Sequence, residues 1–74
     1  MNIYPNPASS YLNIDVSGNL EYHVQIINVN GQVIQTLSQP KLVDLRNLNS
    51  GMYILKISDA NSSSHILERI VVAR

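Results

Sequence analysis

The residues best able to do chemistry in this chain are two histidines, five acidic residues and a run of serines. His23 and His65 would need further converging ligands to bind zinc, or a nearby nucleophile to catalyse acyl transfer. The acidic residues are too scattered for a calcium loop, and the serine run lacks the glycines of a nucleophile elbow. Paired carboxylates for glycoside hydrolysis stay open, but so small a chain has little room for the cleft. We therefore expect no catalytic residue, no metal site, no cofactor and no enzymatic activity.

Size and charge narrow the class of protein further. The 74 residues are enough for a single domain, 1–74, and they include no cysteine, so no disulfide stabilises it. Five basic and five acidic residues cancel, which gives no reason to expect nucleic acid or an anionic membrane as a partner. The longest purely apolar run, 52–55, is far shorter than the ~18 residues of a membrane span. The N-terminal residues lack the basic and apolar regions of a secretory signal peptide.

Apolar residues alternate with polar ones along most of the chain, which predicts strands and no helix. The expected extended segments are 2–7, 11–16, 20–29, 32–37, 42–45, 52–57 and 65–73. About seven short strands separated by turns are typical of an antiparallel sandwich or barrel. We therefore predict an all-β fold, without a prediction of the pairing order.

Turn residues divide the segments. Asn30-Gly31 predicts a hairpin with a type I′ turn, in which both residues have positive φ. The apolar positions change parity at Ile27, which a β-bulge or a strand end buried on both faces explains equally well. Gly51 suits a positive φ at the start of the 52–57 strand. Around this turn we expect five buried residues: Leu45, Leu48, Tyr53, Leu55 and Ile57.

Four tyrosines leave other functions open. Tyr4, Tyr11, Tyr22 and Tyr53 could stack against sugar rings, although tyrosines on strands usually pack at the core edge with the hydroxyl in water. The absence of tryptophan weakens the sugar-binding interpretation. The alternatives are a carbohydrate-binding or adhesive β-sandwich module appended to a secreted enzyme, and a purely structural spacer.

Four motifs follow one another in an order that is more specific than any of them alone. They are Tyr4-Pro5-Asn6-Pro7, the hairpin around Asn30-Gly31, the Leu-x-x-Leu-x-x-Gly-x-Tyr block from Leu45 to Tyr53, and the closing run Arg69-Ile70-Val71-Val72-Ala73-Arg74. In this order they resemble the type A C-terminal sorting domain of the bacterial type IX secretion system (Por secretion system family). The resemblance covers essentially the whole chain. One departure is Glu68, because the closing strand of the family is often more uniformly basic.

The resemblance implies a delivery signal with the fold of a small Ig-like antiparallel β-sandwich. Such a domain directs an N-terminal cargo domain across the outer membrane of Bacteroidota, so that the cargo is secreted or held at the cell surface. The implied partners are the translocon, which recognises the domain, and a sortase. The sortase removes the domain, upstream of Met1 or near Asn2, and joins the cargo to an anionic lipopolysaccharide. The motif positions are then structural: Pro5, Asn6, Pro7, Asn30, Gly31, Leu45, Leu48, Gly51 and Tyr53.

The closing strand is the predicted contact with the translocon. It is apolar at alternate positions, and as an edge strand it could pair with a receptor strand by β-augmentation. We expect Arg69, Val71, Val72 and Arg74 to contribute, although one of the two valines could belong to the core instead. A homodimer formed through an uncovered edge is compatible with so small a sandwich.

Overall fold

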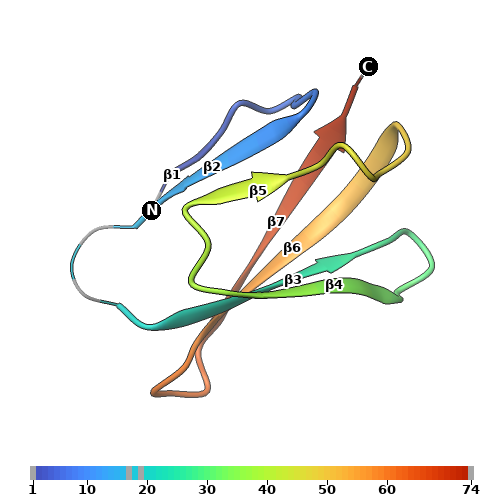
Figure 1. Ribbon diagram of the computed structural model, residues 1–74. Coiled ribbons are helices and arrows are strands. Elements are labelled where there is room, and N and C mark those ends of the chain that lie inside the picture. The colour runs from blue at the N-terminus through green and yellow to red at the C-terminus, as the bar shows by residue number, and fades with distance from the viewer. Residues whose placement is uncertain (1, 17, 19, 74) are drawn as a thin grey trace.

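In the computed structural model, two antiparallel sheets pack face to face as a β-sandwich (Figure 1). The structure describes residues 2–16, 18 and 20–73. The first sheet has the order β1-β2-β5, formed by Asn2–Tyr4, Tyr11–Asp15 and Leu42–Asp44. The second has the order β4-β3-β6-β7, formed by Val33–Ser38, Tyr22–Ile27, Gly51–Asp59 and His65–Val72. The predicted all-β fold of about seven short strands is confirmed. None of the described residues belongs to a helix that could cross a membrane.

Both sheets bury alternate residues in one apolar core, as the sequence pattern requires. The first sheet and its loops contribute Ala8, Leu12, Ile14, Val43 and Leu45, and the second contributes Tyr22, Val24, Ile26, Leu55, Ile57, Ile70 and Val72. Burial of each large apolar side chain contributes about 1.5–3 kcal/mol, before the entropy of ordering the chain is subtracted. No charged residue lies among the buried side chains of the described residues. The domain therefore depends on hydrophobic packing between the sheets.

The corner between β5 and β6 carries the chain from one sheet to the other. Leu45 is buried as predicted, and so are Leu55 and Ile57 on β6. Leu48 and Tyr53 are only half-buried against the core, so the prediction that they are buried holds only in part for these two. Both residues lie at the corner between the two sheets, where the chain turns tightly and Leu48 N donates to Leu45 O over 3.0 Å. The Tyr53 hydroxyl donates a hydrogen bond to the carbonyl oxygen of Asn49 over 2.7 Å.

Gly51 has a φ of +155°, which confirms the predicted positive φ. A Cβ built at this position would meet no atom within 4 Å. The requirement for glycine is therefore conformational and not a matter of space.

The β3–β4 hairpin closes differently from the prediction. Gly31 has a φ of +82°, but Asn30 does not have a positive φ, so the type I′ turn is wrong. Gly31 N donates to Asn28 O over 3.0 Å, and Asn28 N donates to Gln32 O over 2.9 Å. This is a three-residue loop in which a type I turn is followed by a left-handed glycine. The Asn28 side chain stabilises it, because Asn28 Oδ1 accepts from the amides of Asn30 and Gln32, each over 3.0 Å.

The change of parity near the end of β3 does not come from a bulge in that strand. The register between β3 and β4 shifts between Ile26 and Ile27, but the residue it skips is Ile34, so the bulge belongs to β4. The pairing of β3 with β6 stays regular through Ile27, and Ile27 is half-buried on the face opposite the buried Ile26. This favours the second of the two explanations, a strand end buried on both faces. The strand is also shorter than expected. It begins at Tyr22 and ends at Ile27, and Leu20 and Val29 are exposed on either side of it.

Candidate functional site on the terminal strand

Strand β7 holds three of the four residues predicted to contact the translocon, Arg69, Val71 and Val72, and it lies at one edge of the four-stranded sheet. Among the described strands of that sheet it pairs with β6, with Arg69 opposite Ile54 and Val71 opposite Met52. Alternation along the strand turns Arg69 and Val71 to the outer face of the sheet, where Val71 is 38% exposed. The same alternation turns Val72, which is 1% exposed, into the core.

The four predicted contact residues therefore do not share one surface. Val72 cannot touch a partner while the domain is folded, so its role is structural, as was expected for one of the two valines. Arg74 lies outside the described residues. Arg69 and Val71 are accessible, and their role in recognition stays a prediction.

The outer edge of β7 is not open, as pairing with a receptor strand would require. Residues 6–8, which we call the covering segment, lie along it, and Ala8 forms a parallel bridge with Val72. Ala8 N donates to Val71 O, and Ala73 N donates to Ala8 O, both over 2.8 Å. Figure 1 shows the β1–β2 loop, which contains this segment, beside the end of β7. The expectation of a free edge is therefore wrong between Arg69 and Ala73.

Asn6 extends this contact with its side chain. Its Nδ2 donates to Arg69 O, and its Oδ1 accepts from Val71 N, both over 3.0 Å. The carboxamide thus offers β7 one donor and one acceptor, as a peptide unit of a neighbouring strand would. Pro5 and Pro7 on either side have no N–H, so the main chain alone cannot supply the donors of a regular strand. The structural role predicted for Pro5, Asn6 and Pro7 therefore lies in covering the edge of β7.

The open part of this edge is short. The covered groups belong to Arg69, Val71 and Ala73, so by the alternation of a strand the main chain of His65 and Leu67 faces the same way. Among the described residues, the hydrogen bonds from the covering segment reach no further along β7 than Arg69. A receptor strand would find free main-chain groups only around 65–67.

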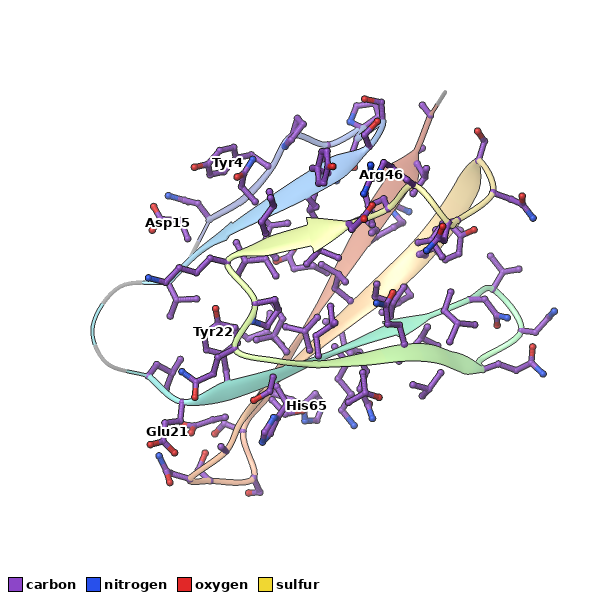
Figure 2. The ribbon with its side chains drawn as sticks, viewed as in Figure 1. Tyr4, Asp15, Glu21, Tyr22, Arg46 and His65 are labelled. Carbon is purple, nitrogen blue, oxygen red and sulfur yellow. The ribbon has the colours of Figure 1, made fainter. Side chains whose placement is uncertain are left out.

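The structure does not assemble a reactive centre from the residues considered at the start. His23 on β3 and His65 on β7 are separated by β6, which lies between their strands. No three His, Cys, Asp or Glu side chains within 2–16, 18 and 20–73 are placed to hold a metal ion. Asp15 and Glu21 line a hollow of about 480 Å³, and both are exposed (Figure 2).

A further acidic residue, Asp44, forms an exposed ion pair with Arg46 at 2.8 Å. The hydrogen bonds that the Arg46 guanidinium donates to the Asp44 carboxylate, and then the charge of that carboxylate, raise the pKa of Arg46. The Arg46 guanidinium also lies 5.3 Å from the centre of the Tyr11 ring. These contacts hold the beginning of the β5–β6 corner in place, and their exposure is typical of a structural contact on the surface.

The four tyrosines do not gather on one surface of the molecule, because only Tyr4 and Tyr11 share a face. Tyr22 is buried, its hydroxyl donates to Pro40 O over 2.6 Å, and burial raises its pKa. Tyr53 is half-buried at the opposite end of β6 from Asp59. Tyr4 and Tyr11 are exposed on the first sheet, and Figure 2 shows Tyr4 pointing away from the sandwich. The four therefore do not form the single aromatic surface on which the sugar-binding alternative depends.

Sequence reasoning missed two residues of this site. Ala8 was not expected in the core, yet it is 1% exposed and bonded to β7 through both its N–H and its C=O. Asn6 was expected to be structural, but its partners on β7 are 63 and 65 positions away. No local pattern in the chain points to either contact. The one available signal is that Pro5 and Pro7 have no N–H, so this segment cannot pair with a strand through its main chain alone.

The fold and the site define a small β-sandwich domain whose first and last motifs meet at one sheet edge. The chain matches the family described as the secretion system C-terminal sorting domain over residues 2–73. Because the match covers nearly the whole chain, the protein belongs to this family, the C-terminal sorting signals of type IX secretion. A comparison with curated proteins found no match.

Membership establishes the general function. The domain is a sorting signal that is attached to a cargo protein and interacts with the type IX secretion machinery. Its cargo is exported across the outer membrane, to the cell surface or the extracellular space.

Proposed function

We propose that the type IX translocon recognises this domain in its folded form, and that the domain has no catalytic activity of its own. One observation carries the proposal. The opening motif at Asn6 and the closing motif at Arg69 and Val71 are joined by hydrogen bonds across 63 and 65 positions of sequence. Unfolding separates these two ends of the family signature, so the complete signal is present only in the sandwich.

We further propose that a sortase removes the domain near its N-terminal end and joins the cargo to an anionic lipopolysaccharide. Asn2 and Tyr4 are exposed on β1, which is an edge strand of the first sheet. Met1 lies outside the described residues. The accessible β1 supports cleavage upstream of the sandwich without unfolding of the core.

The domain acts as a monomer in this proposal. The covering segment leaves little of the β7 edge for pairing with a second copy, so a dimer would have to form through another edge strand, such as β4 or β1. The open part around His65 and Leu67 is shorter than an ordinary strand. Analytical ultracentrifugation of the isolated domain tests this point. A dimer that persists at low micromolar concentration would contradict it.

Export of a reporter tests the central proposal. A periplasm-directed reporter with residues 1–74 at its C-terminal end should reach the medium or the cell surface of a type IX-competent strain. It should stay in the periplasm of a matched strain that lacks the translocon. The same reporter with the domain at an internal position separates a terminal signal from a structural spacer. Retention of the C-terminal fusion in the competent strain, with the domain folded, would contradict the proposal.

Sortase action is read from the same cultures. The exported reporter should be smaller than the fusion by about the mass of this domain, 8.3 kDa, before the lipopolysaccharide is added. Mass spectrometry of the reporter after removal of the glycan locates the new C-terminus. A full-length fusion at the cell surface would leave the sorting function intact and contradict only the cleavage.

A further inference from the structure

The outer face of the four-stranded sheet is apolar at its centre. The main chains of neighbouring strands place Ile27, Ile54 and Arg69 in one row across β3, β6 and β7, with Met52 opposite Val71 in the next row. On the other side of that row, Leu67 lies opposite Lys56. The apolar side chains are accessible, with Leu67 59%, Met52 44% and Val71 38% exposed, and Ile27 and Ile54 half-buried.

A groove of about 370 Å³ runs over part of this face. Its walls are Ile27, Met52, Ile54 and Leu67, together with the tip of the β3–β4 hairpin around Gly31. The three-residue loop described above forms this wall, so the groove depends on the local backbone structure of the hairpin. A contiguous apolar surface with a hollow on it is typical of a site where another protein binds.

The charges on this face have one sign. Among the described strand residues of this sheet, Lys56 and Arg69 are the charged residues that alternation turns outward, besides the two histidines. The two acidic residues of the same strands, Asp59 and Glu68, occupy positions of the opposite parity, in line with the buried Ile57 and Ile70. Although the chain has no net charge, this face is basic around an apolar centre.

We propose that this outer face is the surface by which the domain docks onto the type IX translocon. We define the docking surface as Ile27, Met52, Ile54, Lys56, Leu67, Arg69 and Val71. Its complement is a protein surface that has an apolar ridge to fill the groove and Asp or Glu carboxylates opposite Lys56 and Arg69. The covering segment argues against docking along the β7 edge, because it occupies the main-chain groups of that edge from Arg69 to Ala73, whereas the groove and the two basic residues favour docking on the face. This inference rests on the proposed recognition of the folded domain.

Two matched pairs of variants test the docking surface in the reporter fusion. Leu67→Asp places a carboxylate on it, and Leu42→Asp makes the same change at a leucine of similar exposure, 55%, on the other sheet. Lys56→Glu reverses a charge on it, and Lys41→Glu makes the same change in net charge outside it. We expect export of the Leu67→Asp and Lys56→Glu fusions to fall about tenfold or more, as for contacts at the centre of an interface. Export of the two control fusions should stay within about twofold of the unmodified fusion.

Folding and partner identity are measured on the purified domains. Circular dichroism melting should show all four variants folded, so that a loss of export reports on docking. Leu67→Ala serves as the second variant if Leu67→Asp does not fold, and it should reduce export in the same direction. If the folded Leu67→Asp fusion is exported as well as the Leu42→Asp fusion, the docking surface is wrong while the sorting function stands. If Leu67→Asp does not fold, the same comparison is made with Leu67→Ala. Retention of the unmodified fusion would instead overturn the sorting proposal itself.

Other occupants of this face give different results. Self-association of the unmodified domain in the ultracentrifuge, abolished by Leu67→Asp but not by Leu42→Asp, would overturn the proposal in favour of a second copy. Flotation of the unmodified domain with vesicles of phosphatidylglycerol, lost in Lys56→Glu but not in Lys41→Glu, would overturn it in favour of an anionic lipid surface. A monomer that does not float with these vesicles supports a protein partner.

Discussion

Two asparagines use the same amide chemistry in two different regions of the molecule. Asn28 holds the β3–β4 hairpin through its own neighbours, with acceptor and donor contacts two and four positions away. Asn6 makes the same kinds of contact with the main chain of β7, 63 and 65 positions away. The first contact requires only that a short turn form. The second exists only when the two ends of the chain have been brought together by the rest of the sandwich.

The difference shows which contacts report on folding. Closing this three-residue loop restricts few dihedral angles, so the Asn28 contact can persist in a partly folded chain. The Asn6 contact closes nearly the whole chain, and that entropy is recovered only through the shared core. A translocon that reads the region around Asn6 and β7 therefore reads completion of the fold.

The largest expected effect is on the long-range side of this comparison. Ala8→Asp places a carboxylate at a position that is 1% exposed and hydrogen-bonded to β7 on both sides. A buried, unpaired charge destabilises a small domain by several kcal/mol, so urea denaturation should show a domain that is largely unfolded at 37 °C. Ser9→Asp is the control, because Ser9 is exposed directly beside it. Similar stability of the two variants would mean that the covering segment does not pack as described.

The next effect belongs to a local requirement. Gly51→Val forces a β-branched residue to a φ of +155°, which should destabilise the domain by about 1–3 kcal/mol. Because a Cβ there meets no atom within 4 Å, the loss comes from the backbone and not from a clash. Met52→Val, one residue along the same strand, is the control, and thermal melting followed by circular dichroism measures both. An unchanged melting temperature for Gly51→Val would refute the positive φ.

The two asparagines can be compared directly by truncation. Asn6→Ala removes two hydrogen bonds to β7 and should lower the free energy of unfolding by about 1–2 kcal/mol. The main sign is local: amide exchange at Val71 and Ala73 should accelerate in Asn6→Ala and stay slow in Asn28→Ala. Asn28→Ala should instead accelerate exchange at Asn30 and Gln32. Equal exchange at Val71 in the two variants would remove the distinction between the regions.

What the sequence predicted follows the same division. Strand positions and the core residues Leu45, Leu55 and Ile57 were predictable, because alternation of apolar residues is a property of short segments. The positive φ of Gly51 was predictable for the same reason. Even a local feature failed where two local preferences competed. Asn30-Gly31 favours a type I′ turn, but the Asn28 side chain stabilises a longer loop with only Gly31 left-handed.

The site was predicted only in part, because its contacts are long-range. The closing strand was expected at a sheet edge, and it is there. That the opening motif covers this edge depends on how the two sheets are placed, which no window of the sequence records. Val72 and Val71 have the same residue type, so only their positions relative to the core separate the buried one from the accessible one.

Tyr22 provides a contact of intermediate range and the smallest expected effect. Its hydroxyl donates to Pro40 O, 18 positions away, and burial raises its pKa. A raised pKa means that the folded state holds the phenol proton more tightly than the unfolded state. This contribution is therefore complete below the ordinary tyrosine pKa of about 10, and it is lost as the pH rises through the folded-state pKa.

The test compares urea unfolding at neutral pH and at about pH 11 in the original domain and in Tyr22→Phe. Tyr22→Phe should be less stable at neutral pH by about 1 kcal/mol or less, because it leaves Pro40 O without this donor. The original domain should lose more stability than Tyr22→Phe on going to alkaline pH, since the other tyrosines and the lysines titrate in both. An equal loss in the two would show that Tyr22 is not the residue that links alkaline pH to unfolding. In that case the connection from β4 to β5 does not depend on the phenol proton. The Tyr22 contact would then resemble the local contact of Asn28, which does not require the complete fold.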